Sequence, residues 1–174
     1  YIARGSYLLR QGNPVSDLLV YIGEGTPNGS YYRNDFDPEI PKTINFDNVN
    51  TDILLNRLSV KNNSLVLPEG TQYKVLVLKN SKVLSLPTLK RILEIANSGI
   101  PVVGEMPEKL AGYNQSESDK SEFSEFLSQL SPLIEDVSDW NVFLSTNRIT
   151  PDLMVNNGEA IDYAHRKTEQ EDIY

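Results

Sequence analysis

Two glutamates directly follow predicted strands, where a parallel sheet gathers ligands. Glu24 lies between two glycines after the apolar run 15–22, and Glu105 follows the short run 101–104. The carboxyl ends of parallel strands meet at one edge of a sheet, so we expect both side chains at the same crevice. Two carboxylates about 5 to 10 Å apart could hydrolyse a glycoside. The sequence gives no sign of that distance, so a small stand-alone glycosidase is one of three hypotheses.

Aromatic residues in the stretch 26–41 are further candidates for a ligand crevice. The stretch is rich in Pro, Gly, Asn and Asp and has no hydrophobic period, which predicts a long loop. Loops of this length are often functional. Tyr31 and Tyr32, together with Phe36, could stack on a sugar or a partner surface. The alternative is that they hold the loop against its own domain.

His165 and Arg166 are candidates for contacts between domains. His165 is the single histidine of the chain, and the acidic residues after Arg166 indicate a solvated charge network. A histidine in a strand is usually a hydrogen-bonded packing residue. The second interpretation is that this pair holds a neighbouring domain against this one, and catalysis comes third.

The sequence lacks the residues and motifs that most other kinds of catalytic, phosphate-binding and metal-binding site require. There is no cysteine, no Gly-x-Ser-x-Gly motif and no glycine-rich phosphate loop, so we expect no nucleophilic triad, no nucleotide site, no metal site and no cofactor in this chain. Three alternating acids could bind calcium, but they lack the twelve-residue loop spacing; they are Asp35, Asp37 and Glu39. A net charge of -8 argues against nucleic acid as a partner. No apolar run is long enough to cross a membrane.

The stretch 73–104 positions the candidate crevice. An apolar run at 73–78 predicts a central parallel strand, and apolar residues spaced i, i+3, i+4, i+7 from Leu89 predict a helix. Pro87 suits the start of that helix and Gly99 its end. With the strand at 101–104 this makes a β-α-β crossover. We therefore predict an α/β, doubly wound parallel sheet, flavodoxin-like or class I glutamine amidotransferase-like, with helices on both faces.

The remaining elements complete a two-part organisation. Patterns predict helices at 2–11, 53–58 and 121–130, a strand at 43–49, a hairpin at 58–68 around Asn62-Asn63, and a last strand at 140–144. Runs at 161–166 and 172–174 alternate like an antiparallel pair. The predicted α/β domain is 1–150. The segment 151–174 is interpreted as a linker and the first strands of a following β-sandwich domain. Asn157-Gly158 is the expected turn in this segment. The chain begins with Tyr1 rather than Met, which we interpret as a piece of a longer polypeptide.

Several stretches together resemble glycoside hydrolase family 106, the α-L-rhamnosidase-like enzymes. The most specific are ARGSYLLRQG, LLNRLSVKNNSLVLPEGTQYKVLVL and AHRKTEQEDIY, and the similarity covers nearly the whole chain. It implies an accessory domain after a (β/α)8-type catalytic barrel and before β-sandwich domains of the same polypeptide. The family's catalytic carboxylates would lie in that barrel, so none is assigned to this chain.

The resemblance also implies what the parent enzyme would do. It would hydrolyse terminal α-L-rhamnosides of plant polysaccharides, with calcium as a candidate cofactor of the parent and a periplasmic or extracellular location. The fragment alone would then be inactive. The rival hypothesis is a stand-alone carbohydrate- or protein-binding module that uses the crevice and the loop 26–41.

Overall fold

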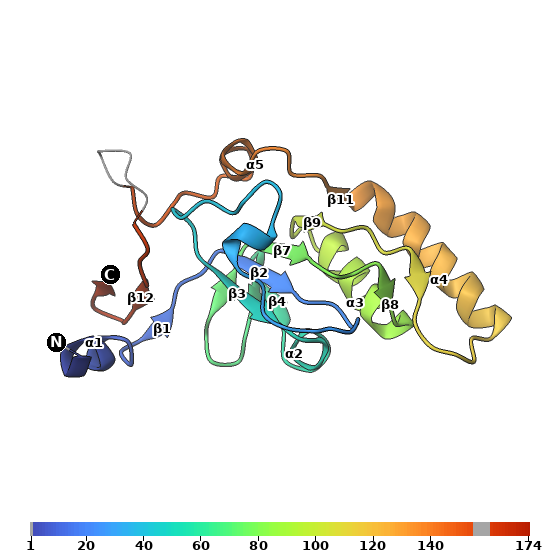
Figure 1. Cartoon of the computed structure of the whole chain (residues 1–174), viewed down its shortest axis with the longest axis horizontal. Helices are drawn as coiled ribbons and strands as arrows, with labels where there is room; N and C mark the ends of the chain where they lie inside the picture. The colour runs from blue at the N-terminus through green and yellow to red at the C-terminus, as the bar shows by residue number, and fades with distance from the viewer. Residues whose placement is uncertain (1, 155–160) are drawn as a thin grey trace.

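A five-stranded parallel sheet forms the centre of the computed structural model, which describes residues 2–154 and 161–174. Its strands lie in the order β11-β9-β7-β2-β3 (Figure 1). Every neighbouring pair is parallel. The bounds are β2 (Leu18–Tyr21), β3 (Phe46–Val49), β7 (Val75–Leu78), β9 (Val102–Gly104) and β11 (Ile134–Glu135). The prediction of an α/β fold around a central parallel strand is confirmed, although that strand is 75–78 rather than the predicted 73–78.

Both faces of the sheet are covered by apolar residues. Alternate side chains of β2 enter two different clusters, because successive residues of a strand point to opposite faces. One cluster joins the sheet to α2 (Thr51–Asn56), α3 (Leu86–Asn97) and α4 (Glu117–Leu130). The other joins it to α5 (Trp140–Thr146) and to Ile40 and Ile44, which precede β3. The strands β2 and β7 are buried along their whole length.

The helix α3 has the boundaries that its sequence predicts. Ser85 is its N-cap residue and Pro87 lies in its first turn, where a proline needs no N–H partner. Gly99 follows the last turn with a φ of +87°, a conformation that favours glycine. Leu89 and Ile92 are fully buried on the face that packs against the sheet.

The predicted hairpin is formed by β4 (Ser59–Lys61) and β5 (Ser64–Val66). Asn62 and Asn63 both have positive φ values, 50° and 59°, which two-residue hairpin turns require. A third strand, β6 (Gln72–Tyr73), pairs with β5. Tyr73 therefore belongs to this small antiparallel sheet, and the assignment of Tyr73 to the central strand was wrong.

The strand predicted at 140–144 was also wrong, because these residues form the helix α5. Asp139 accepts hydrogen bonds from the N–H groups of Asn141, at 2.7 Å, and Val142, which caps the helix. Trp140, Phe143 and Leu144 then form one buried stripe. A short apolar run suits a strand or one helical turn equally well by periodicity, and the cap decides between them. The fifth strand of the sheet is instead β11.

The two ends of the chain lie side by side (Figure 1). After α1 (Ile2–Leu8), the strand β1 (Asn13–Pro14) pairs with β12 (Arg166–Lys167), which pairs with β13 (Asp172–Ile173). The antiparallel pair expected from the runs 161–166 and 172–174 is present only in part, because its first strand is 166–167 and residues 161–165 form no strand; β1 extends the pair. The expected turn at Asn157-Gly158 lies outside the described residues, and the assignment of 151–174 to a following domain stays a prediction. Short elements complete the chain: β8 (Val83–Leu84), β10 (Lys109–Leu110), η1 (Arg33–Asp35) and η2 (Ser131–Leu133).

Candidate functional site

Glu24 follows β2 at the carboxyl edge of the sheet, as predicted, and its carboxylate caps α3. Its oxygens accept hydrogen bonds from the backbone N–H of Ser85 at 2.6 Å, from the Ser85 hydroxyl at 2.8 Å and from the Thr88 hydroxyl. The Ser85 hydroxyl makes no N-cap bond of its own. A negative charge is favoured at a helix N-terminus by the free N–H groups and the helix dipole. Both oxygens of Glu24 are thus used within the domain.

The crevice expected beside Glu24 is filled by the chain itself. Gly23, with a φ of +79°, lies so close to the backbone of Asn80 that a Cβ atom at this position would overlap the Asn80 carbonyl oxygen. The side chain of Asn80 also packs against Gly25. The loops after β2 and β7 therefore touch at the point where a ligand of an open parallel sheet would enter.

Glu105 lines a small cavity at the same edge of the sheet. The cavity has a volume of about 260 Å³, and Phe36, Asp136 and Trp140 also line it. One carboxylate oxygen of Glu105 accepts a hydrogen bond from the Ser81 N–H at 3.2 Å, and the other lies 3.5 Å from Lys79 Nζ. Since β7 separates the strands that precede them, Glu24 and Glu105 bind different parts of one loop rather than each other.

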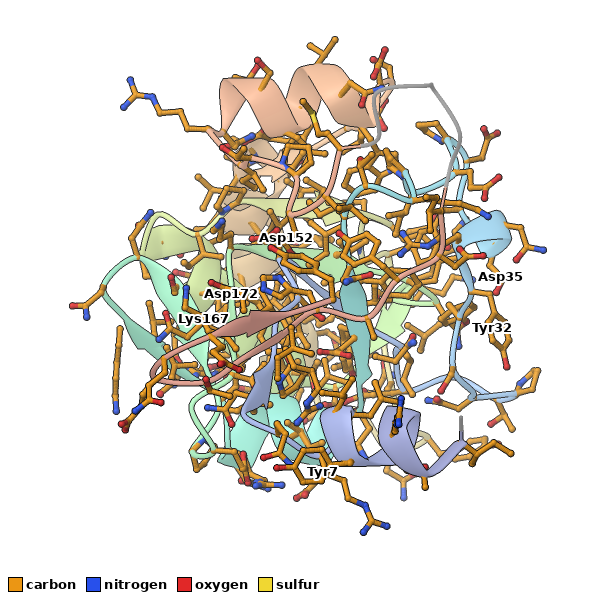
Figure 2. All side chains as sticks on the ribbon, turned by 90° about the vertical axis from the view of Figure 1, so that its left-hand side faces the viewer. Tyr7, Tyr32, Asp35, Asp152, Lys167 and Asp172 are labelled. Carbon is orange, nitrogen blue, oxygen red and sulfur yellow. The ribbon has the colours of Figure 1, made fainter. Side chains whose placement is uncertain are left out.

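The two tyrosines of the long loop differ in their surroundings. Tyr31 packs against Phe36 in an edge-on arrangement with ring centroids 6.3 Å apart, and Lys79 Nζ lies 5.8 Å from its ring centroid. Burial raises the pKa of Tyr31, and Glu105 and Asp35 raise it further. Tyr32 is 72% exposed and lies at the periphery of the molecule (Figure 2). The structure therefore brings Tyr31, Lys79 and Glu105 together but leaves Tyr32 in solvent.

The side chain of Arg166 links the two ends of this chain, and that of His165 packs within its last part. His165 Nε2 lies 2.9 Å from an oxygen of Asp172, and the imidazole ring stacks on Tyr174 with centroids 4.4 Å apart. Arg166 donates hydrogen bonds to the backbone oxygens of Gln11 at 2.5 Å and Gly12 at 2.6 Å. Both side chains are used in contacts within the chain, and a contact of this pair with a further domain stays a prediction.

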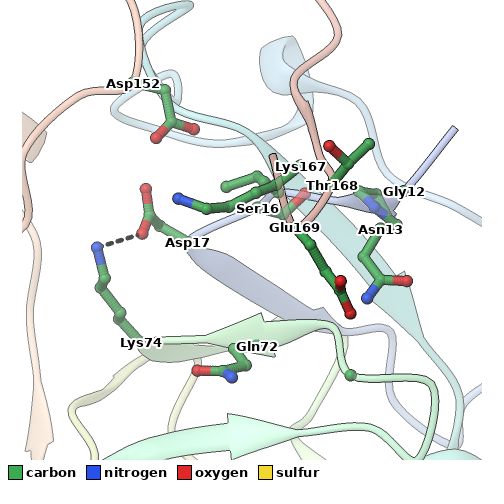
Figure 3. A pocket seen from close by; sticks show the side chains of 13 residues that line it. Gly12, Asn13, Ser16, Asp17, Gln72, Lys74, Asp152, Lys167, Thr168 and Glu169 are labelled. Atoms are coloured by element: carbon green, nitrogen blue, oxygen red, sulfur yellow. Dashed lines mark ion pairs between the residues drawn. The ribbon is translucent and has the colours of Figure 1, made fainter. Parts of the chain in front are cut away.

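A larger cavity lies at the opposite, amino edge of the sheet. Its volume is about 750 Å³, and it is lined by residues of β1, of the segment before β2 and of the last part of the chain (Figure 3). Asp17 is 4% exposed, and one of its oxygens lies 2.7 Å from Lys74 Nζ. The other oxygen is buried and has no hydrogen-bond partner. Burial raises the pKa of Asp17, Lys74 lowers it, and Asp152 raises it further.

Sequence reasoning missed Asp17 and Asp152. Asp17 lies within the run 15–22 that was predicted as a strand, and Asp152 stands 135 positions away from it. Ligand sites were predicted only at the carboxyl ends of the strands, whereas this cavity lies at their amino ends. Charged residues that border predicted buried strands on the amino side would have been the available signal.

Two absences hold for residues 2–154 and 161–174. No group of three or more Asp, Glu or His residues is arranged to hold a metal ion. None of the helices described is long and apolar enough to cross a lipid bilayer.

This chain is similar to parts of longer known proteins. The family model described as alpha-L-rhamnosidase matches residues 1–174. A protein of Formosa agariphila with the provisional name beta-glucuronidase is 33% identical over 183 aligned positions, which cover 100% of this chain and 15% of that protein. The rhamnosidase of Novosphingobium sp. PP1Y superposes with a TM-score of 0.83 at 26% identity, over 99% of this chain and 18% of that one. The chain thus spans less than a fifth of the length of either relative.

Proposed function

Because the chain belongs to the alpha-L-rhamnosidase family, glycoside hydrolase family 106, we propose that it is a non-catalytic accessory domain of a larger glycoside hydrolase. The observation that carries this proposal is the length comparison. The whole of this chain corresponds to 15% of one relative and 18% of the other. A segment of that size has the length of one domain.

The arrangement of the sheet supports the finer proposal of a doubly wound, flavodoxin-like domain. Counted along the chain, the five parallel strands follow the order 2-1-3-4-5, which is that of flavodoxin-like sheets. Apolar clusters on both faces are consistent with helices on both sides. We also propose that 151–174 leads into a following β-sandwich domain, with the catalytic barrel before Tyr1.

Contacts of the candidate carboxylates support a non-catalytic role for this part of the enzyme. A general acid or a nucleophile needs a carboxylate oxygen that can reach the substrate. Both oxygens of Glu24 accept hydrogen bonds at the start of α3, and the neighbouring glycines press against Asn80. Glu105 is tied to Lys79 and to the Ser81 N–H. The chemistry is therefore assigned to another part of the parent polypeptide.

The proposed substrate of the parent is a terminal α-L-rhamnoside, in keeping with the family description and the rhamnosidase relative. Plant polysaccharides are the proposed source of that sugar, which suits a periplasmic or extracellular enzyme. A calcium ion is proposed only for the parent enzyme and not for this chain.

Hydrolysis of a chromogenic rhamnoside tests this function. The whole gene product and the isolated 174-residue chain would be assayed on p-nitrophenyl α-L-rhamnopyranoside, with p-nitrophenyl β-D-glucuronide as the second substrate. We expect turnover of the rhamnoside by the whole product and none by the isolated chain. Turnover by the isolated chain that is lost in Glu24→Gln or Glu105→Gln would contradict the proposal and revive the small stand-alone enzyme.

The alternative function, a stand-alone carbohydrate- or protein-binding module, is supported by the cavity beside Glu105. Aromatic and acidic groups meet there, as in many sugar sites, although its 260 Å³ lies below the usual size of a ligand pocket, about 300 Å³ or more. Titration of the isolated chain with rhamnose-containing oligosaccharides would decide. Saturable binding that Glu105→Gln, in the cavity, abolishes and that Tyr32→Ala, outside the cavity, leaves unchanged would favour the module.

A further inference from the structure

Two carboxylates at the amino edge of the sheet each have one buried oxygen without a hydrogen-bond partner among the described residues. These oxygens are Oδ2 of Asp17, whose side chain is 5% exposed, and Oδ2 of Asp152, whose side chain is 16% exposed. Figure 3 shows the two carboxylate groups turned toward one another, Asp17 from just before β2 and Asp152 from the segment after α5. Facing carboxylates repel each other, and a buried acceptor without a donor destabilises the folded state.

The basic groups nearest to this pair leave Oδ2 of Asp17 without a donor. Lys74 Nζ lies 2.7 Å from Oδ1 of Asp17, the other oxygen of that carboxylate. His165 Nδ1 lies 3.1 Å from Asp152 Oδ2, but the two atoms are not aligned as a hydrogen bond, and His165 Nε2 lies 2.9 Å from Asp172. A carboxylate oxygen can accept more than one hydrogen bond, so Asp152 Oδ2 can still accept one from Asp17.

A single proton satisfies both free oxygens. A proton on Oδ2 of Asp17 makes this atom a donor toward Asp152, while Oδ1 still accepts from Lys74. The pair then carries one negative charge instead of two, as closely spaced carboxyl groups generally do. Burial raises the pKa of Asp17 above 3.8, Lys74 lowers it and the charge of Asp152 raises it further, so that the pKa is raised overall. Geometry and charge therefore agree that Asp17 holds the proton.

The segment that carries Asp152 depends on side chains for its position. The backbone of 150–154 makes no hydrogen bond to another described residue, and the segment belongs to no helix or strand. Ile149, just before it, is buried, whereas Met154 at its end is 74% exposed. Asp152 supplies a polar contact between this segment and the amino edge of the sheet, so a change in the charge of the pair acts directly on the segment.

We propose that Asp17 and Asp152 share one proton in the folded chain, and that loss of this proton at higher pH releases the segment 150–154 from the amino edge of the sheet. The proton passes from Oδ2 of Asp17 to solvent, and no other covalent bond changes. Two buried carboxylates then face each other, where their repulsion is stronger than in water. The other charged or titratable groups around the pair are Lys74, Tyr163, His165, Lys167, Glu169 and Asp172. The proposal goes beyond the proposed function and does not depend on it, because every group in it belongs to this chain.

Nuclear magnetic resonance of the 174-residue chain tests the shared proton. The carboxyl carbon signal of Asp17 reports its protonation, and we expect the pKa of Asp17 to lie above 3.8 in the wild type. In Asp152→Asn, the titration midpoint of Asp17 should move to lower pH, because the neighbouring negative charge is gone. Glu108→Gln, which removes an exposed ion pair with Lys82 elsewhere, is the matched control and should leave the midpoint unchanged.

The backbone amides of 152–154 test the release of the segment in the same samples. Their heteronuclear NOE values should fall toward those of a flexible chain as the pH rises, with the same midpoint as the titration of Asp17. In Asp17→Asn the side chain is neutral at every pH, so this fall should be absent.

Each result decides the proposal. A pKa of Asp17 at or below 3.8 would overturn it. A midpoint that Asp152→Asn leaves in place would show that the two groups share no proton. Amide NOE values that stay constant through the titration of Asp17 would show that the segment is not released. The first and the last of these results are obtained on the wild type, so they decide the proposal even if a variant fails to fold.

Discussion

At the N-terminus of α3, the carboxylate of Glu24 holds the position where free backbone N–H groups favour an anion. Its partners are Ser85 and Thr88. We predict that Glu24→Ala lowers the free energy of unfolding of the isolated chain by about 1–3 kcal/mol, since a charged hydrogen-bonding group and a helix cap are lost together. Urea unfolding followed by circular dichroism measures this change.

The control for this prediction is Glu108→Gln. Glu108 forms an exposed ion pair with Lys82, with more than half of each side chain in solvent. Its removal should change stability by less than about 0.5 kcal/mol. Equal stability of Glu24→Ala and Glu108→Gln would show that Glu24 does not cap the helix and is free for another role.

Asp17 should make the stability of the isolated chain depend on pH. Burial raises its pKa above the ordinary value of 3.8, so the folded state holds a proton on this group more tightly than the unfolded state does. The stabilising contribution is complete below pH 3.8 and is lost as the pH rises through the raised pKa. We therefore predict that Asp17→Asn becomes more stable relative to the wild type as the pH rises from about 4 to neutrality.

Chemical denaturation at a series of pH values checks this prediction for Asp17→Asn. Lys74, the partner of Asp17, is half exposed and can be solvated when the carboxylate is removed. A difference between the two proteins that stays constant with pH, or that shifts in favour of the wild type as the pH rises, would be incompatible with a raised pKa for Asp17.

Two loops at the carboxyl edge of the sheet depend on glycine for their contact. Gly23 has a positive φ and lies against the Asn80 backbone, whereas Gly29 has no atom near the position of a Cβ. We predict that Gly23→Ala lowers the free energy of unfolding by about 2 kcal/mol or more, through backbone strain and overpacking. Gly29→Ala should change it by less than about 0.5 kcal/mol. If thermal unfolding finds the two variants alike, the crevice beside Glu24 is open rather than filled.

The helix α5 covers one face of the sheet through a single stripe. Phe143 is buried and Val142, on the same helix, is 63% exposed. We predict a loss of about 3–5 kcal/mol for Phe143→Ala and a change within about 0.5 kcal/mol for Val142→Ala. Fluorescence of Trp140, the only tryptophan of the chain, reports the docking of this helix during unfolding. If 140–144 formed a strand, substitution of every second residue would instead lower the free energy of unfolding.

Elements that are specified locally could be predicted from the sequence. The helix α3 carries an apolar stripe with Pro87 and Gly99 at its ends, and the hairpin is centred on two asparagines that accept positive φ. The run 140–144 was wrongly assigned to a strand, because five apolar and polar residues fit a strand or a helical turn and only the Asp139 cap decides. The strand β11 is two residues long, too short for any period to show.

The candidate site was only partly predictable, for a similar reason. The rule for parallel strands correctly placed Glu24 and Glu105 at one edge of the sheet. Their hydrogen-bond partners depend on the loop between β7 and α3, whose path has no period in the sequence. The cavity around Asp17 depends on Asp152 and on the pairing of the two ends of the chain, and a single sequence gives no measure of such distant contacts.

At the scale of the whole molecule, the family, the length comparison and the convergence of the two ends lead to one account. The chain is an α/β unit in which Glu24 and Glu105 are used in internal contacts, and its two ends are paired through β1 and β12. Under the proposed function, it would contribute packing and orientation of neighbouring domains, and the catalytic groups would belong to another part of the parent polypeptide.

The mass of the native gene product tests this account most directly. An antibody raised against the 174-residue chain would detect the product in an extract of the source organism. We predict a single band several times larger than 19.6 kDa, as the 15% and 18% shares of the two relatives imply. A band near 19.6 kDa would contradict the account, and the cavity beside Glu105 would become the first site to test for a function of its own.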